Sequence, residues 1–300
     1  MNTSPPISLA TSSAFSSARI SDYFELTKPR LVFLVLLSTV VGFILGSSGP
    51  IDFLLCFTML AGTALVAAGS MALNEWLERN EDGRMARTAK RPLPTNRVNP
   101  LGALIFGVVI SSLGLIILEF AVSTSAAVLA GLTIASYLFL YTPLKKKTSL
   151  CTIVGAIPGA LPPLIGWSAA ASELSYPGWI LFSILFLWQM PHFLAIGWMY
   201  REDYRRAGFR MLSLDDTEGE QVGRQMLLYT LALFAVSLLP TVSGITSYFY
   251  FAGAFVLGAG LTAFTVLSLK EMDQKARPLF LASILYLTCL LILMVIDKQP

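Results

Sequence analysis

Residues 74–94 read NEWLERNEDGRMARTAKRPLP and separate two long apolar runs. The whole chain has only 21 basic and 18 acidic residues among 300, so a concentration of charge at one place is unusual for it. Acids and an amide come first at four-residue spacing, and basic residues and a Pro-Leu-Pro sequence follow. Because proline cannot continue a helix, the stretch is interpreted as a helix end followed by a charged loop.

Apolar runs like the two that flank this stretch recur along the chain. Hydrophobic residues make up 55% of the sequence and charged residues 13%, against roughly a quarter charged in an ordinary globular domain. A bilayer core of about 30 Å requires about 20 apolar residues of helix. We predict an all-α membrane protein, with residues 21–300 forming a single bundle of nine transmembrane helices around a cytoplasm-facing central cavity. The nine runs are found at approximately 31–49, 51–73, 101–121, 124–143, 150–171, 178–200, 225–243, 247–269 and 278–296.

The basic residues predict the orientation of the spans, because lysines and arginines accumulate on cytoplasmic loops. The segment before the first span and every second loop after it together hold 20 of the 21, and Lys298 alone lies on the other side. We therefore predict a cytoplasmic N-terminus and an external C-terminus. Residues 1–20 are rich in Ser, Thr and Pro and contain a single arginine, so they are interpreted as a disordered cytoplasmic tail. The weak presequence favours a bacterial inner membrane over a mitochondrial one.

Asn74, Glu78 and Asp82 are the most informative polar residues of the charged stretch. On a helix their spacing places all three on one face, within about 80° and over about 12 Å, so one ion can contact only a neighbouring pair. Carboxylate and amide oxygens suit Mg²⁺, which commonly binds through one or two carboxylates plus substrate phosphates. Arg87 and Arg91 follow and offer guanidinium groups to phosphate oxygens. The order predicts a metal–diphosphate site; the alternative is a solvated loop whose charges only set the topology.

Two further segments carry polar residues on the same predicted side of the membrane. Tyr141 and Lys145 end the fourth span, where they can hold diphosphate oxygens or act as an interfacial aromatic and a topogenic lysine. Asp203 and Glu202 follow the sixth span and are the remaining acids that can approach a second metal. These residues extend the predicted site to other parts of the chain.

His192 is the only histidine, and it lies near the end of the sixth predicted span beside Trp188. An ionisable residue inside a membrane indicates a functional site. A neutral imidazole can ligate a haem iron or relay a proton, and it can also be a hydrogen-bonded packing residue. Residues 155–167 hold three prolines and several small residues, which predicts a kinked helix lining a pocket or plain helix packing. The three cysteines show no metal or disulfide pattern.

Together these segments resemble the protohaem IX farnesyltransferases (haem O synthases), a branch of the UbiA-type superfamily of intramembrane prenyltransferases. The superfamily signature is Asn-x3-Asp-x3-Asp followed by Arg-Thr-x2-Arg-Pro-Leu, which is similar to residues 74–82 and 87–93. Further segments match the branch itself. They are Leu-Thr-Lys-Pro-Arg at 26–30, Pro-Pro-Leu-x-Gly-Trp at 162–167, Trp-x2-Pro-His-Phe at 188–193, Asp-Tyr-x2-Ala-Gly-x2-Met-Leu at 203–212 and Ala-Arg-x-Leu-Phe at 276–280.

The resemblance implies transfer of a farnesyl group from farnesyl diphosphate to a vinyl group of haem B, with addition of water, to give haem O for haem A biosynthesis. It implies Mg²⁺ as cofactor, a lipid bilayer as the environment and haem A synthase as a partner, and it implies no binding of nucleic acid. The catalytic residues it implies are Asn74, Glu78, Asp82, Arg87, Arg91, Tyr141 and Lys145. The implied metal ligands are Asn74, Glu78, Asp82 and Asp203. The implied substrate contacts are Arg30, Trp188, His192, Asp203 and Tyr204.

The chain departs from the family pattern at three positions. Glu78 replaces the middle aspartate, Ala207 stands where the second acidic loop usually has another aspartate, and Arg210 replaces a proline. The missing carboxylate leaves one or two metals open. Two other functions remain as alternatives. The function of a prenyltransferase for quinone precursors does not account for the segments at 188–193 and 203–212. A transporter does not need acids followed by paired arginines.

Overall fold

The computed structural model describes residues 19–171 and 173–299, which form a bundle of helices. Nine helical segments in this part of the chain are long and apolar enough to cross a membrane, which confirms the predicted number. They are Pro29–Gly46 (α2), Phe53–Leu77 (α3), Pro100–Ala121 (α5), Thr124–Leu144 (α6, η1 and α7), Cys151–Ala171 (α8 and α9), Tyr176–Met199 (α10), Glu220–Val242 (α13 and α14), Tyr248–Ser268 (α15) and Met272–Ile296 (α16). The predicted tail lies outside the described residues, apart from its last two positions.

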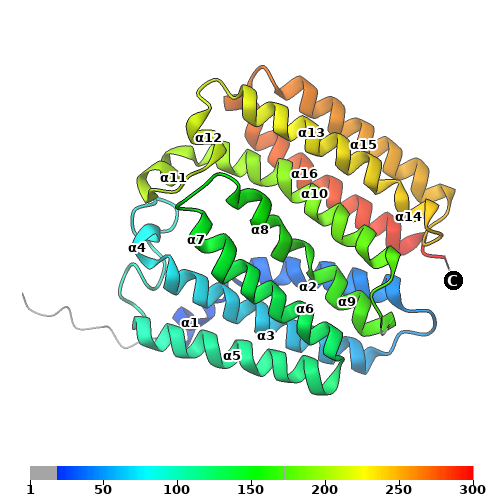
Figure 1. Cartoon of the computed structure of the whole chain (residues 1–300), viewed down its shortest axis with the longest axis horizontal. Coiled ribbons are helices and arrows are strands. Elements are labelled where there is room, and N and C mark those ends of the chain that lie inside the picture. The colour runs from blue at the N-terminus through cyan, green and yellow to red at the C-terminus, as the bar shows by residue number, and fades with distance from the viewer. Residues whose placement is uncertain (1–18, 172, 300) are drawn as a thin grey trace, which may run out of the picture.

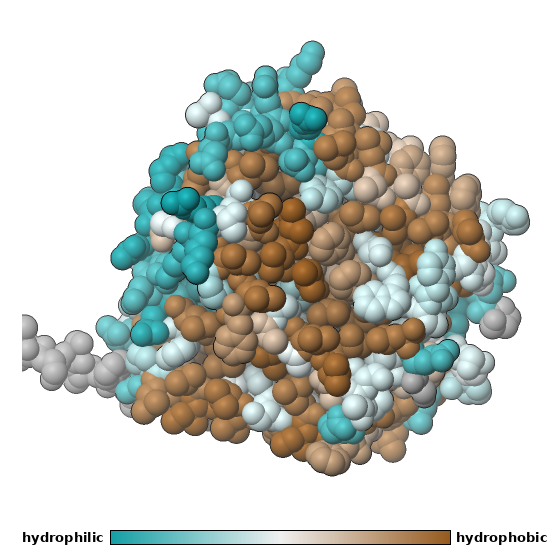
Figure 2. All heavy atoms as spheres, in the orientation of Figure 1, coloured by the Kyte–Doolittle hydropathy of each residue, from teal (hydrophilic) through white to brown (hydrophobic). Residues whose placement is uncertain are grey.

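Short helices gather at one end of the bundle. The spans lie side by side, and three short helices together with the loop 83–98 cover the end at the left of Figure 1. We call this region the charged end, because hydrophilic residues gather there while apolar residues cover the middle of the molecule (Figure 2). Its helices are Arg79–Asp82 (α4), Arg201–Ala207 (α11) and Leu212–Asp215 (α12). A further short helix, Ile20–Leu26 (α1), precedes the first span.

Glycines bring neighbouring spans into close contact. A Cβ atom on Gly69 of α3 would lie 2.0 Å from Ser111 Oγ and 2.7 Å from the carbonyl oxygen of Gly107, both on α5. A Cβ atom on Gly166 of α9 would lie 1.9 Å from the carbonyl oxygen of Thr39 on α2. In a membrane, helices associate mainly by such close packing of small residues. These contacts set the spacing between α3 and α5 and between α2 and α9.

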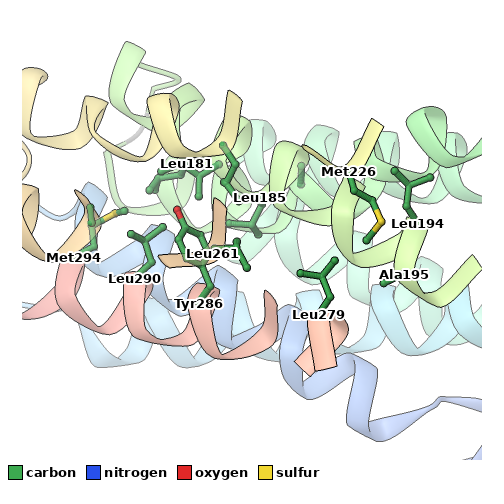
Figure 3. Close-up of a cluster of buried hydrophobic side chains, with 14 of the residues drawn as sticks. Leu181, Leu185, Leu194, Ala195, Met226, Leu261, Leu279, Tyr286, Leu290 and Met294 are labelled. Carbon is green, nitrogen blue, oxygen red and sulfur yellow. The ribbon is translucent and has the colours of Figure 1, made fainter. Parts of the chain in front are cut away.

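A second core joins α10, α13, α15 and α16. Buried leucines and methionines from these four helices meet in Figure 3, among them Leu185, Met226, Leu261 and Leu290. Tyr286 lies in the same cluster and its hydroxyl is 2.7 Å from Ser237 Oγ, so its polar atom has a partner. This core positions α10, which carries the sequence-predicted histidine.

Three of the predicted helices are interrupted. Leu161 separates α8 (Cys151–Ala160) from α9 (Pro162–Ala171), which confirms the predicted kink at the prolines. The fourth span contains a π-helical segment, η1 (Ser136–Tyr141), between α6 (Thr124–Ala135) and α7 (Thr142–Leu144), and the sequence did not predict it. Similarly, Leu238 separates α13 (Glu220–Ser237) from α14 (Leu239–Val242).

The last residues of the chain form a clasp at the end opposite the charged end. The Asp297 carboxylate accepts hydrogen bonds from the backbone N–H groups of Ser247 and Tyr250, at 2.7 and 2.9 Å, and so caps the start of α15. Lys298 Nζ donates to the carbonyl oxygens of Ile44, at 2.7 Å, and Ser47, at the end of α2. A cation at a helix C-terminus complements the helix dipole and the free carbonyls. This explains why one lysine lies away from all the others.

Candidate active site

Asn74, Glu78 and Asp82 keep their spacing across a break in the helix. α3 ends at Leu77, Glu78 has φ −99° and ψ 12°, and α4 begins at Arg79. The backbone ladder nevertheless continues, because Glu78 N–H donates to Asn74 O at 2.9 Å and Asp82 N–H donates to Glu78 O at 2.8 Å. The three residues are only 2%, 4% and 1% exposed. The predicted polar residues are therefore buried at the charged end, which excludes the solvated-loop alternative.

Each of the two carboxylates of this trio is held by a cation. Lys145 Nζ lies 2.8 and 2.9 Å from the two oxygens of Glu78, and Arg91 lies 2.8 Å from Asp82 Oδ2. Burial opposes the charge of Lys145, but the neighbouring Glu78 carboxylate outweighs it and raises the lysine pKa. Asn74 Nδ2 donates to Thr142 Oγ1 at 3.1 Å. The structure thus brings Lys145 and Arg91 to the acids, as the sequence predicted, and pairs them there.

Two residues that the sequence reasoning missed complete this cluster. Lys28 Nζ lies 3.3 Å from Asn74 Oδ1 and 3.7 Å from Glu75 Oε1, and Arg91 Nε lies 3.5 Å from the same Glu75 oxygen. Burial, and then the nearby Arg91, lower the pKa of Lys28 to about 8. Glu75 Oε2 is buried and has no hydrogen-bond partner among the described residues. The signal for Lys28 was present in the Leu-Thr-Lys-Pro-Arg segment, from which Arg30 was chosen instead.

Lys28 has a strained backbone, whereas Arg30 lies apart from the cluster. Lys28 has φ 49° and ψ 62°, a left-handed conformation that costs a residue other than glycine of order 1 kcal/mol, and Pro29 follows it directly. This conformation turns the chain between α1 and α2 and places the ammonium beside Asn74. Arg30 is exposed, and no hydrogen bond or ion pair joins its side chain to another described residue. The structure therefore does not place Arg30 among the buried acids and bases.

The loop 83–98 meets α11, which lies more than a hundred residues further along the chain. An Asp203 oxygen accepts a hydrogen bond from Ala86 N–H at 3.2 Å and another from Arg206. These bonds outweigh the effect of burial and lower the Asp203 pKa. The Arg87 guanidinium lies 5.4 Å from the centre of the Tyr204 ring, and it donates to the Tyr204 hydroxyl at 3.3 Å. The two long charged segments of the sequence therefore form one surface.

Tyr141 is the last residue of the π-helical segment and lies beside Lys145, which pairs with Glu78. Its ring is 4.5 Å from Lys145 Nζ and stacks on Tyr137 at 5.6 Å between centroids. A Cβ atom on Gly155 of α8 would lie 2.5 Å from the Tyr141 ring, so only glycine fits beneath it. Single-turn π segments inside helices often occur at functional sites. The structure places Tyr141 beside Lys145, as predicted.

His192 and Trp188 face α16 rather than the acids. His192 Nδ1 lies 2.9 Å from Ser283 Oγ, and Trp188 Nε1 donates to Ser283 O at 2.6 Å. No hydrogen bond in the described part of the chain joins His192 to the acidic cluster. The two regions are linked through α8, because Gln189 Nε2 donates to Ala156 O at 3.1 Å, next to the glycine that contacts Tyr141. The predicted site therefore has two parts, one at the charged end and one within the span α10.

The donor set fits Mg²⁺ that binds together with a phosphate ligand. Among the residues that the structure describes, no three His, Cys, Asp or Glu side chains form a preformed metal site. Mg²⁺ does not need one, because it usually takes one or two carboxylates and completes its shell with water and substrate phosphates. Glu78, Asp82 and the unpartnered oxygen of Glu75 supply hard oxygen donors within one buried cluster.

Proteins of known name are similar to the chain in sequence or in structure. The protoheme IX farnesyltransferase of Solibacter usitatus is 44% identical over 287 residues, which cover 92% of this chain and 98% of that protein. The protein of the same name from Aquifex aeolicus is 40% identical over 283 residues, covering 93% and 95%. A digeranylgeranylglyceryl phosphate synthase structure has a TM-score of 0.79 at 18% identity, covering 93% of this chain and 98% of that one.

A more distant solved structure supports the same fold. A UbiA homolog from Archaeoglobus fulgidus bound to DMAPP and Mg²⁺ has a TM-score of 0.63 at 15% identity, covering 91% of this chain and 99% of that one. The profile of the UbiA prenyltransferase family matches residues 35–290, which is most of the chain. Nine apolar spans and a shared helical bundle agree with that match. The chain belongs to the UbiA prenyltransferase family and is a multi-pass membrane enzyme.

Proposed function

We propose that this prenyltransferase transfers a farnesyl group from farnesyl diphosphate to a vinyl group of haem B, with addition of water, to give haem O for haem A biosynthesis. The observation that carries the donor half is the buried cluster in which Glu78 and Asp82 are paired with Lys145 and Arg91. The acceptor half rests on relatives 40–44% identical over nearly their whole length that are named protoheme IX farnesyltransferase. We infer that haem A synthase takes up the product.

The diphosphate would bind at the charged end. Neighbouring pairs among Asn74, Glu78 and Asp82 would hold one or two Mg²⁺ ions, with Asp203 as a further ligand, and the bound metal would neutralise charge on the departing diphosphate. Arg91 and Lys145 already lie within 3 Å of these carboxylates, so they can donate to diphosphate oxygens beside the metal. Lys28 and Tyr141 contact members of the same cluster, and Arg87 and Tyr204, which bond to each other, would complete the diphosphate site.

The acceptor would enter a central cavity open to the cytoplasm, with the N-terminus cytoplasmic and the C-terminus outside a bacterial inner membrane. Ionisation breaks the C–O bond to the diphosphate and leaves an allylic farnesyl cation, to which the outer carbon of the vinyl group bonds. The positive charge passes to the inner vinyl carbon, where water adds as a hydroxyl group and loses a proton. The site must therefore exclude water first and admit it afterwards. Trp188 and His192 lie among apolar side chains where a macrocycle can pack, and exposed Arg30 is available to an anionic group of either substrate.

The test is production of haem O in membranes. The chain is expressed in cells that lack haem O synthesis, and the extracted haems are separated by chromatography and identified by mass spectrometry. We expect haem O. A prenylated quinone precursor with no haem O would overturn the acceptor, and this is the alternative that family membership leaves open.

A second test addresses the metal ligands. Asp82→Asn should lower haem O formation by about 10²–10³-fold, the size of effect seen when a group that stabilises developing charge is removed, while the variant remains folded in membranes. Asp215→Asn is the matched control, because Asp215 is an exposed acid of α12 at the same end. Substantial activity in Asp82→Asn would remove the metal assignment.

A further inference from the structure

Ser283 determines which nitrogen of His192 carries the proton. Ser283 is 1% exposed, and its hydroxyl makes two contacts, at 2.7 Å to Phe280 O and at 2.9 Å to His192 Nδ1. A carbonyl oxygen only accepts, so the single hydroxyl hydrogen must point to Phe280 O. The contact with the imidazole then requires a hydrogen on Nδ1. In its neutral form, His192 then carries its hydrogen on Nδ1 and its lone pair on Nε2.

The ring of His192 is also held in one orientation. Its centroid lies 4.7 Å from the Trp188 ring at an interplanar angle of 27°, and 4.6 Å from the Phe280 ring at 31°. Trp188 is itself fixed by the hydrogen bond to Ser283 O. In the described part of the chain no hydrogen bond engages Nε2, and the three aromatic side chains are only partly buried. A ligand atom at Nε2 would therefore displace no hydrogen-bond partner, and the ring would need little ordering.

This arrangement has the features of a metal-ligating histidine. Such residues almost always donate the other ring N–H to a fixed acceptor, which sets the tautomer and the ring orientation. Histidine is also a common axial ligand of haem iron. His192 is seven residues from the end of α10, which places it about 10 Å along the helix from the charged end. An iron bound there would lie beside the aromatic rings of Trp188 and Phe280.

We propose that Nε2 of His192 binds the iron of the haem acceptor, and that Ser283 is the positioning residue that keeps the proton on Nδ1. The inference rests on the proposed function, because it takes haem as the acceptor. It assigns a single atom, and it differs from a propionate contact by His192, which would need a donor on Nε2. It also assigns a function to the buried hydroxyl of Ser283 on α16, which packing alone does not explain.

The test uses the full-length protein in detergent micelles with haem B. Ferric haem bound to the wild type should show the absorption and electron paramagnetic resonance spectra of imidazole ligation. His192→Ala should lose this signature, and added imidazole should restore it. His192→Cys gives a second readout, because a thiolate ligand produces a different spectrum. Identical spectra for the wild type and both variants would overturn the proposal.

Ser283→Ala separates positioning from packing. The variant keeps the imidazole but loses the acceptor for Nδ1–H, so the dissociation constant for haem should rise about 10–100-fold and the spectrum should change. Ser183→Ala on α10 is the matched control, because Ser183 only bonds back to its own helix at Trp179 O. Unchanged haem affinity in Ser283→Ala would refute the positioning role.

Haem O formation distinguishes this inference from the proposed function. If the wild type makes haem O but His192→Ala binds haem with unchanged spectra, the iron ligand is wrong and the function stands. If the wild type makes no haem O, the function is wrong whatever the spectra show.

Discussion

Glu78 and Lys145 form a buried ion pair, with side chains 6% and 10% exposed. Removing one member of such a pair leaves an unpaired buried charge. Lys145→Met should therefore lower the free energy of unfolding by about 3–5 kcal/mol, and the double variant with Glu78→Gln should recover most of the loss. Denaturant unfolding in detergent, followed by circular dichroism, measures both.

Lys146 provides the control for this cycle. It pairs with Glu81 at 2.6 Å, but its side chain is 50% exposed, so solvent screens the pair. Lys146→Met should change the free energy of unfolding by less than about 1 kcal/mol. Equal losses for Lys145→Met and Lys146→Met would show that burial does not determine the strength of these pairs.

The sequence predicted which residue types meet at the charged end, but not all of the partners. Asp82 and Arg91 are near in sequence and carry complementary charges, so their pairing was predictable. Lys28 lies 46 residues from Asn74, and its approach depends on a positive φ that lysine rarely adopts. The Ser283–His192 contact spans 91 residues and depends on how α10 packs on α16. Such contacts are tertiary, and no local pattern encodes them.

At the scale of helices, the spans were predictable because the length of an apolar run is a local property of the sequence. The break at Leu161 was predictable as well, since the prolines that cause it are visible. The π segment Ser136–Tyr141 was not, because one extra residue in a helical turn changes neither composition nor hydropathy. The sequence also did not predict that α3 ends at Leu77, before Glu78 and Asp82.

Helix packing gives a prediction at this scale. Gly69→Ala on α3 should lower the melting temperature in detergent, because the new Cβ meets Ser111 Oγ and the backbone of Gly107, and backbone cannot move aside cheaply. Gly131→Ala on α6 is the matched control, since a Cβ there meets nothing within 4 Å. Alanine favours a helix over glycine by about 1 kcal/mol, so Gly131→Ala should not lower the melting temperature. A lower value for both variants would mean that helix contact is not the cause.

At the scale of the whole molecule, the C-terminal clasp joins α2, α15 and α16. Burial acts against the Asp297 carboxylate, but hydrogen bonds from Ser247 and Tyr250 outweigh it and lower its pKa below the usual 3.8. An acid with a lowered pKa stabilises the fold above its unfolded pKa, and the contribution is lost as the pH falls through the folded value. Asp297→Asn should therefore lower the melting temperature at pH 5–8.

The difference between the wild type and Asp297→Asn should shrink only below about pH 4, where the wild-type carboxylate becomes protonated too. Melting curves from pH 3 to 8 measure it. Glu271→Gln serves as the control, because Glu271 is an exposed acid whose ion pair is 4.0 Å long. A difference that stays constant down to pH 3 would contradict the role of the charge.

The clasp also has a consequence for biosynthesis. Lys298 contacts Ile44 across 254 residues, so the end of the first span is capped by a residue that the ribosome adds 254 positions later. At about 5–20 residues per second, synthesis from Ile44 to Lys298 takes on the order of ten to fifty seconds, and during this time the end of the first span lacks the lysine. The cap on the first span therefore forms only after residue 298 has been made, and a chain that stalls before this residue leaves the end of α2 without the lysine.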